Sequence, residues 1–270
     1  VLTFASGPTN SMRGAAFLSG LKDAMVVDIG GTTSDVGALT HGFPREASVA
    51  VDIGGVRTNF RMPDVYSFGL GGGSHVQPEP LKIGPQSVGY RLTQEALVFG
   101  GDTLTTSDIA VAAGVAEMGD PSRVTHLDRS LVNAALARIQ EMCETAVDRM
   151  KTSAEAVPVI IVGGGSVLIS RTIAGASEMV KPNHFEAANA VGAAIAQISG
   201  EVDRVYSLEK RTRDNALDDA KAEATAKAVE AGADAKTVQI VDVEDVPLTY
   251  LPGNATRIRV KAVGDLTLTK

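Results

Sequence analysis

Two apolar strands that each run directly into a cluster of glycines constrain this 270-residue chain more than any other feature. The first strand, residues 24–28 (AMVVD), leads into Gly-Gly-Thr-Thr at 30–33, and the second, residues 159–162 (VIIV), into Gly-Gly-Gly-Ser at 163–166. Continuous apolar strands are typical of sheets that are covered on both faces. Residues 130–150 carry apolar side chains at spacings of three and four, as an amphipathic helix does. The pattern predicts an α/β protein with a sheet between layers of helices.

The same patterns predict the remaining elements and two domains. The composition shifts near Gly200, after which charged and alanine-rich residues dominate. We therefore expect a main α/β domain over residues 1–200 and a small α+β appendage over residues 201–270. Helices are expected over residues 11–21, within 102–119, and over 184–199 and 211–233, with strands over 36–39, 48–53, 65–68, 238–246 and 257–263.

Composition excludes several classes of protein. A net charge of −7 argues against a nucleic-acid binder that neutralises phosphates. The single cysteine, Cys143, excludes a disulfide framework, and its place on the apolar side of the 130–150 helix makes it a core residue. No apolar run approaches the roughly 20 residues that cross a bilayer. We expect a soluble cytoplasmic protein without nucleic-acid or membrane partners.

The Asp-Ile-Gly-Gly-Thr-Thr run after the first strand could bind a phosphate. Asp28 lies at the open end of the strand, and the glycines let the backbone fold tightly over a ligand. Backbone amides in such a turn form an anion-binding concavity, and a neighbouring carboxylate can hold Mg²⁺ through water ligands. The simpler alternative is a tight hairpin whose turn is capped by Asp28. The run continues through Asp35 into a return strand, which favours the phosphate site.

Three further features are candidates for the same site. Residues 163–166 would present amides to an anion or a flat ring, or would merely join a strand to a helix. Residues 71–74 could form a loop near a reacting phosphate, with Ser74 as a hydrogen-bond donor, or a mobile connection. Asp108 could contact Mg²⁺ or substrate, or it could be a helix N-terminal carboxylate favoured by the helix dipole.

In this order, the two turns resemble motifs of the actin/hexokinase/heat-shock-chaperone ATPase superfamily. Residues 28–35 look like its second phosphate motif and residues 163–166 like its adenosine motif. Residues 8–21 and 187–197 resemble its two connecting helices. The resemblance implies a ribonuclease-H-like mixed sheet flanked by helices, as one lobe of a two-lobed clamp that closes on ATP.

One branch of that superfamily is more similar. The strings SGPTNSMRGAAFLSGLKD, VVDIGGTTSDVG, MPDVYSFGLGGGSH, GDTLTTSDIAVAAG and IIVGGGS resemble hydantoinase/oxoprolinase proteins, and the match runs from Ser6 to the end. That family has a first Asp-Gly-Gly-Thr motif near its N-terminus, and none precedes Val1. The Asp-Ile-Gly-Gly run at Asp52 lies where the family has a strand of its second lobe. Because the chain also lacks an initiator Met, we expect the C-terminal part of a longer protein.

The resemblance implies an ATP- and Mg²⁺-dependent hydrolase that phosphorylates the amide oxygen of a hydantoin or 5-oxoproline ring before water opens it. The alternatives are the ATP-using subunit of a ketone carboxylase and a non-catalytic actin-like nucleotide switch. Expected partners are the cyclic amide, the missing N-terminal lobe, and a second enzyme subunit or another copy of the chain. One lobe alone should bind nucleotide weakly. The implied residues are catalytic Asp28 and Asp108, with Asp28 also placing Mg²⁺-bound water; nucleotide-binding Gly30, Gly31, Thr32, Thr33, Gly163, Gly164, Gly165 and Ser166; and Gly71, Gly72, Gly73 and Ser74 in a substrate or phosphate loop.

Overall fold

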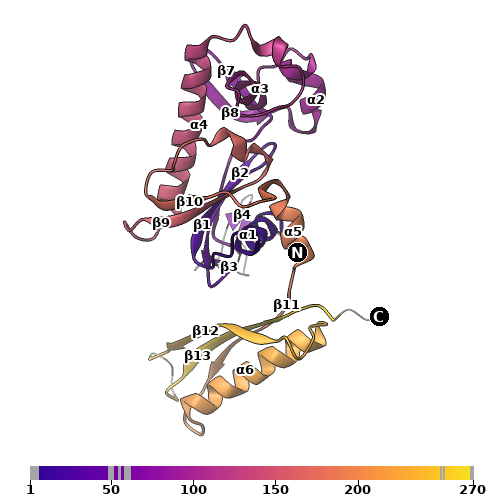
Figure 1. The fold of residues 1–270 in the computed structure, drawn as a ribbon. Helices are drawn as coiled ribbons and strands as arrows, with labels where there is room; N and C mark the ends of the chain where they lie inside the picture. The colour runs from indigo at the N-terminus through magenta and orange to yellow at the C-terminus, as the bar shows by residue number, and fades with distance from the viewer. Residues whose placement is uncertain are drawn as a thin grey trace. The chain divides into compact units, whose positions relative to one another are not determined.

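A computed structural model describes residues 6–47, 52–53, 56–57, 62–249, 251 and 253–267 (Figure 1). The chain forms two compact units, Val1–Ala194 and Ile195–Lys270. The change of composition at Gly200 falls just inside the second unit, within its first strand. That residues 1–200 form an ATPase lobe and residues 201–270 an appendage stays a prediction.

The first unit is built on a mixed sheet, as the sequence predicts. Strands β1, β9 and β10 run parallel, whereas β2 is antiparallel to β1 and to β6. An antiparallel second strand beside a parallel set is the arrangement expected for a ribonuclease-H-like lobe. Across the sheet the strands are β10 (Ala176–Val180), β9 (Val157–Val162), β1 (Ala24–Ile29) and β2 (Ser34–Thr40), with β3 (Phe43–Pro44) and β6 (Val65–Phe68) both paired to β2.

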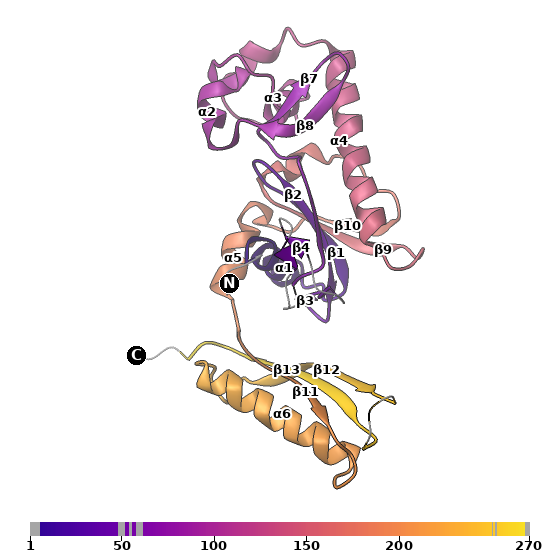
Figure 2. The same cartoon turned by 180° about the vertical axis from the view of Figure 1, so that it is seen from behind.

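Helices cover both faces of this sheet (Figures 1 and 2). Successive side chains of a strand point to opposite faces of the sheet. Odd-numbered and even-numbered residues of β1 therefore belong to two different hydrophobic cores. Met25, Val27 and Ile29 of β1 join the core under helix α4 (Arg129–Met150). Ala24 and Val26 join the core under α1 (Ser6–Ser19) and α5 (Ala188–Ala194). Asp28 therefore projects from the face that α1 and α5 cover.

The segment between β6 and α4, called the insertion below, carries the glycine-rich residues 71–74 and Asp108. Within the expected range 102–119 the helix is short, and the hairpin and 3₁₀ turns around it were not predicted. Its small core comprises Ala96, Val98, Val111 and Val124. In order the insertion contains β7 (Ser74–Gln77), β8 (Lys82–Ser87), η1 (Gly89–Arg91), α2 (Leu92–Glu95), η2 (Leu97–Phe99), α3 (Thr106–Ala112) and η3 (Pro121–Val124).

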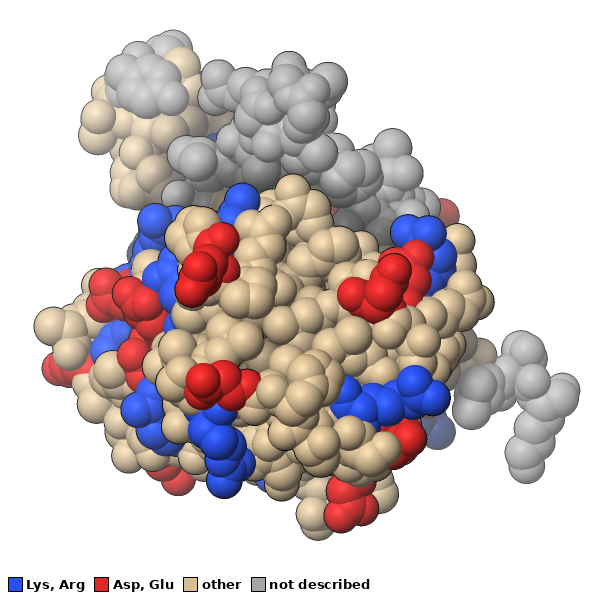
Figure 3. Space-filling view, turned by 90° about the horizontal axis from the view of Figure 1, so that it is seen from above, with Lys and Arg blue, Asp and Glu red and all other residues tan. Residues whose placement is uncertain are grey.

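Figure 3 looks onto the end of the first unit that carries this insertion. Basic and acidic side chains alternate around an area that carries neither. Opposite charges that are interspersed in this way give no strong field of one sign over this face.

The second unit is a three-stranded antiparallel sheet with one helix on a single face (Figure 2). Helix α6 (Arg213–Glu230) packs through alanines at every fourth position, and a methyl group on Gly200 would lie 2.2 Å from the Ala224 carbonyl oxygen. Small side chains thus allow the helix to lie close to the sheet. The strands lie in the order β11 (Ile198–Tyr206), β13 (Thr256–Gly264) and β12 (Gln239–Pro247), and the alanines are Ala216, Ala220, Ala224 and Ala228.

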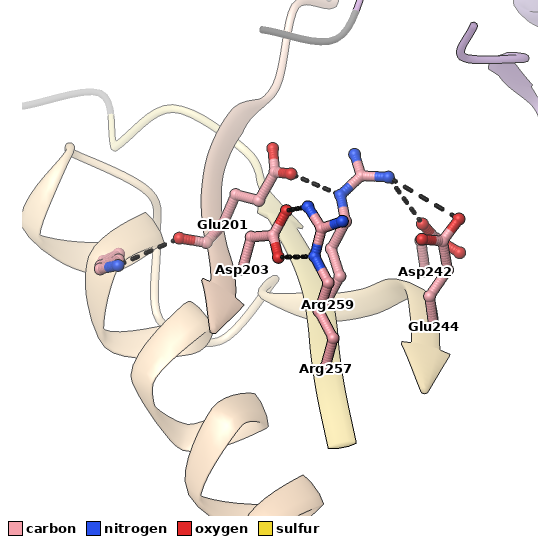
Figure 4. Close-up of polar contacts among 7 residues, drawn as sticks. Glu201, Asp203, Asp242, Glu244, Arg257 and Arg259 are labelled. Atoms are coloured by element: carbon pink, nitrogen blue, oxygen red, sulfur yellow. Dashed lines mark hydrogen bonds and ion pairs between the residues drawn. The ribbon is translucent and has the colours of Figure 1, made fainter. Parts of the chain in front are cut away.

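The other face of this sheet carries ion pairs (Figure 4). Arginines of the central strand lie between carboxylates of the two edge strands. Arg257 makes two hydrogen bonds, of 2.6 and 2.7 Å, with Asp203. Arg259, whose side chain is 3% exposed, lies 2.6 Å from Glu201 and within 3.9 Å of the carboxylates of Asp242 and Glu244. The two edges are thereby tied to the central strand by charge as well as by the backbone.

Three expectations differ from the structure. The helix expected over 184–199 is wrong beyond Ala194, because Ile198 begins β11 and pairs with Gly264. Helix α1 begins at Ser6 rather than at residue 11. Of the strand expected over 48–53, residues 48–51 lie outside the described part of the chain, and β4 (Asp52–Ile53) pairs with β5 (Val56–Arg57). Among the helices described, none is both long and apolar enough to span a bilayer.

Exchange of one glycine on α1 tests the close contact between α1 and α5. A methyl group on Gly14 would lie 1.8 Å from the Ala188 carbonyl oxygen, whereas one on Gly7 would meet nothing within 4 Å. We expect Gly14→Ala to lower the free energy of unfolding by about 2 kcal/mol or more, because backbone atoms cannot move aside cheaply. Gly7→Ala is the matched control and should be close to neutral. Equal denaturant midpoints for the two variants would contradict this packing.

The only cysteine provides a second test of the core. Cys143 is fully buried on α4, and burial raises the pKa of its thiol to about 12. Since the thiolate is the reactive form, native protein at pH 8 should not react with Ellman's reagent, while denatured protein should release one equivalent of chromophore. Rapid labelling of the native protein would place Cys143 outside the core.

Candidate functional site

The two glycine turns lie side by side at one edge of the sheet. Strands β1 and β9 are parallel neighbours in which Asp28 is opposite Val162, so both turns follow at the same end. A methyl group on Gly163 would lie 2.3 Å from Oδ1 of Asp28, and one on Gly165 would lie 2.5 Å from Cγ2 of Ile29. Gly163 also has a φ of 86°, which disfavours other residues. The predicted proximity of the two motifs is thus present in the structure.

Asp28 lies at this junction in a largely buried position. Burial raises the pKa of its carboxyl group, a hydrogen bond from Ser11 lowers it, and the neighbouring charge of Asp35 raises it. Asp35 is directly opposite Asp28 on β2, and the Ser67 hydroxyl donates to it. Asn189 of α5 donates to Ser11 at 3.0 Å. Neither Ser11 nor Asn189 was predicted as a site residue, because the partners of both lie far away along the chain.

The turn after β1 keeps its amides directed toward the open side. The carbonyl of Gly30 accepts from the Gly72 amide at 3.0 Å, and that of Gly31 accepts from the Gly73 amide at 2.7 Å. In a trans peptide the C=O and the next N–H point in opposite directions, so the N–H groups of Gly31 and Thr32 point away from these bonds. Residues 31–33 are exposed, and their amides have no hydrogen-bond partner in the described part of the chain.

The loop at 71–74 packs against this turn and uses its own amides to do so. A methyl group on Gly71 would lie 2.4 Å from the Thr32 nitrogen. Besides the two bonds to the turn, the Ser74 amide donates to the Gly71 carbonyl, and the Gly71 amide donates to Oγ of Ser74 at 2.9 Å. Ser74 is fully buried. All four backbone N–H groups of this loop therefore bond within the protein.

Asp108 lies at the N-terminus of α3, on the far side of that loop. Its Oδ2 accepts from the amide and hydroxyl of Thr105 at 2.7 and 2.8 Å, and its Oδ1 accepts from the Val98 amide at 2.8 Å. Thr105 and Asp108 form a capping box and are both fully buried. These are the contacts that the helix N-terminal alternative for Asp108 predicts.

The turn after β9 holds an unpaired polar group. Residues 164–168 form a 3₁₀ turn, and the buried Ser166 hydroxyl has no hydrogen-bond partner among the residues that the structure describes. Lys181, directly after β10, donates to the Ser166 carbonyl at 3.0 Å and lies 4.6 Å from the centroid of the Phe185 ring. The Gly163 amide donates to the Phe185 carbonyl at 2.9 Å. Lys181 and Phe185 were not predicted, although a lysine at the carboxyl end of a strand was the available signal.

Together these groups fit a phosphorylated ligand with a hydrated cation. The open amides of Gly31 and Thr32 can donate hydrogen bonds to an anion. Asp28, whose Oδ1 lies against Gly163, supplies a carboxylate at the junction of the two turns. The described residues contain no group of three or more His, Cys, Asp or Glu side chains that could hold a metal. One carboxylate suits Mg²⁺, which keeps most of its waters and takes phosphate oxygens.

Comparison with known proteins gives a family match and partial relatives. Residues 1–156 match the family described as hydantoinase/oxoprolinase. A stretch of 121 residues is 35% identical to the acetone carboxylase beta subunit of Xanthobacter autotrophicus, and one of 119 residues is 29% identical to the acetophenone carboxylase gamma subunit of Aromatoleum aromaticum. Each alignment covers 42% of this chain and 16% of the relative.

Two solved structures share the fold over almost the whole chain. Nucleotide-free acetone carboxylase superimposes with a TM-score of 0.67 at 18% identity, covering 97% of this chain and 49% of its own. The ATP-dependent caprolactamase of Pseudomonas jessenii gives 0.67 at 14% identity, with 98% and 50% covered. The chain thus spans about half the length of both. At these identities the likeness establishes the α/β fold with its mixed sheet.

The raised pKa of Asp28 predicts a pH-dependent effect of Asp28→Asn on stability. Burial disfavours the ionised carboxyl, so Asp28 destabilises the native state increasingly as pH rises through its raised pKa. The asparagine variant cannot ionise. We expect it to melt at a higher temperature than wild type at pH 8, and the gain should disappear below pH 4. A loss of stability of equal size at both pH values would contradict this assignment.

Proposed function

Because the chain belongs to the hydantoinase/oxoprolinase family, we propose that it is the nucleotide-binding lobe of an ATP-dependent enzyme that hydrolyses a cyclic amide. One observation carries the proposal: the N–H groups of Gly31 and Thr32 point away from the loop at 71–74, in the turn that directly follows Asp28, and the Asp28 carboxylate lies against Gly163 of the other turn. A nucleoside triphosphate with its Mg²⁺ ion requires an anion-binding turn next to a group that holds the cation. The ATP-dependent caprolactamase of the same fold supports the choice of substrate class.

Each turn has a separate role in this proposal. The amides of residues 31–33 orient the terminal phosphates, whereas the Gly30 amide donates to the Thr33 carbonyl and shapes the turn. Asp28 holds a water of the Mg²⁺ shell. Residues 163–166 border the adenosine through the backbone of the turn. Bound ATP would supply the phosphoryl group that converts the amide oxygen into a leaving group. Catalysis by this chain is then positioning and charge stabilisation.

The supporting roles follow from contacts within the protein. Since the amides of Gly71–Ser74 and both carboxylate oxygens of Asp108 are already bonded, we assign these residues to holding the phosphate turn rather than to ligand contact. The half-length match to both solved structures supports an N-terminal lobe that completes the site. A cytoplasmic location fits the use of ATP.

A second candidate is the ATP-using subunit of a ketone carboxylase. It is favoured by the 35% identity to the acetone carboxylase beta subunit over 121 residues. In that case the partner would be a second enzyme subunit. Asp28 and the two turns would have the same role in both enzymes, because they would bind ATP and not the amide or ketone that accepts the phosphoryl group.

Substrate-dependent ATP turnover by the full-length protein distinguishes the two candidates. We expect phosphate release to rise on addition of 5-oxoproline or hydantoin and to stay unchanged with acetone and bicarbonate. The reverse pattern would establish the carboxylase. Turnover that responds to neither, but to a protein partner, would point to a nucleotide switch.

Replacement of Asp28 tests its role within the site. We expect Asp28→Ala to reduce turnover about 10- to 100-fold, because the hydrated cation loses its protein anchor. Asp218→Ala, on the exposed face of α6, is the control and should keep wild-type rates. A normal rate in the Asp28 variant would refute the proposed role.

A further inference from the structure

We propose that Thr106 and Ser107 are positioning residues for the phosphate turn, which they reach through the glycine loop at 71–74. The inference rests on the proposed nucleotide site and adds two residues that do not touch the ligand. The Thr106 hydroxyl donates to the Gly71 carbonyl. Ser107 donates to the Gly72 carbonyl twice, from its hydroxyl at 2.8 Å and from its amide at 2.9 Å.

The loop passes this constraint on to the turn. With the Gly71 and Gly72 carbonyls held by α3, the next two amides, of Gly72 and Gly73, point the other way, toward the turn. They donate to Gly30 and Gly31 at 3.0 and 2.7 Å. The same rule applied once more turns the N–H groups of Gly31 and Thr32 outward. Two hydroxyls on α3 thus set the direction of two ligand-binding amides through alternating peptide planes.

The loop has little room to adopt another arrangement. A methyl group on Gly71 would lie 2.5 Å from the Gly31 carbonyl carbon, and one on Gly73 would lie 3.1 Å from the Gly31 carbonyl oxygen. The backbones of loop and turn are therefore in direct contact. A small rotation of the loop must move the peptide planes of the turn.

The first turn of α3, which carries the two hydroxyls, is itself held in place. Thr106 is fully buried and Ser107 is 5% exposed. The capping box of Thr105 and Asp108 closes the first turn of α3, and Asp108 is bonded to Val98 in the neighbouring 3₁₀ turn. The capping role of Asp108 explains why this buried carboxylate lies near the proposed site although we assign it no contact with the ligand. Any ligand that shifts α3 would alter the phosphate-binding amides.

Variants that remove or keep the hydroxyl at nearly constant shape test this role. Thr106→Val combined with Ser107→Ala removes both hydroxyl donors and leaves the bond from the Ser107 amide, whereas Thr106→Ser keeps the hydroxyl of residue 106. Ser19→Ala removes a similar hydroxyl-to-carbonyl bond, of 2.7 Å to Ala15, away from the site. Two readouts are needed on the full-length protein that includes the N-terminal lobe: hydrogen exchange of the Gly72 and Gly73 amides without ligand, and affinity for the ATP analogue AMP-PNP with Mg²⁺.

We expect the double variant to speed exchange of both amides about tenfold and to weaken AMP-PNP binding by a similar factor, which corresponds to about 1.4 kcal/mol. Thr106→Ser and Ser19→Ala should match wild type in both. Unchanged exchange, or faster exchange with unchanged affinity, would overturn the positioning role. If wild type itself fails to bind AMP-PNP, the proposed function fails, while the exchange data still decide whether α3 holds the loop.

Discussion

The pairing of two loop amides with the carbonyls of Gly30 and Gly31 is the constraint on which the candidate site depends. A tight glycine turn has many conformations available, and most of them would not direct neighbouring N–H groups to one side. Bonds of 3.0 and 2.7 Å fix two successive peptide planes. Glycine is required on the loop, because a methyl group on Gly71 would lie 2.4 Å from the Thr32 nitrogen, whereas one on Gly31 would meet nothing within 4 Å.

The rest of the unit positions this turn relative to Asp28. Parallel pairing of β1 and β9 brings both glycine turns to one edge, and the alternation of side chains sends Asp28 toward α1 and α5. There it meets Ser11, which Asn189 holds in place from the other helix. The close contact at Gly14 is needed because the two helices must approach until these polar groups meet. The close packing of α1 against α5 therefore also sets the polar surroundings of the Asp28 carboxylate.

Local patterns were sufficient for the strands and helix that form the sheet and its cover. The 24–28 and 159–162 strands are continuous apolar runs and the 130–150 helix has a clear period, whereas the parallel pairing that brings both glycine turns to one edge was not predicted. The resemblance to known motifs supplied the fold class. Periodicity failed where tertiary contacts decide: Ile198 looks helical in its alanine-rich surroundings but pairs with Gly264. Asp108 had two readings until its contacts with Val98 were known.

The arrangement also accounts for how one lobe can be shared by enzymes with different acceptors. Acetone carboxylase and the caprolactamase have the same fold over this chain, although the names of the two enzymes refer to a ketone and a cyclic amide. The groups that we assign to the nucleotide are backbone amides and the carboxylate of Asp28, and such groups carry no information about the shape of a ring. We infer that selection of the acceptor lies with residues outside the two turns. A change of substrate within the family would then leave Asp28 and the loop that holds its turn unchanged.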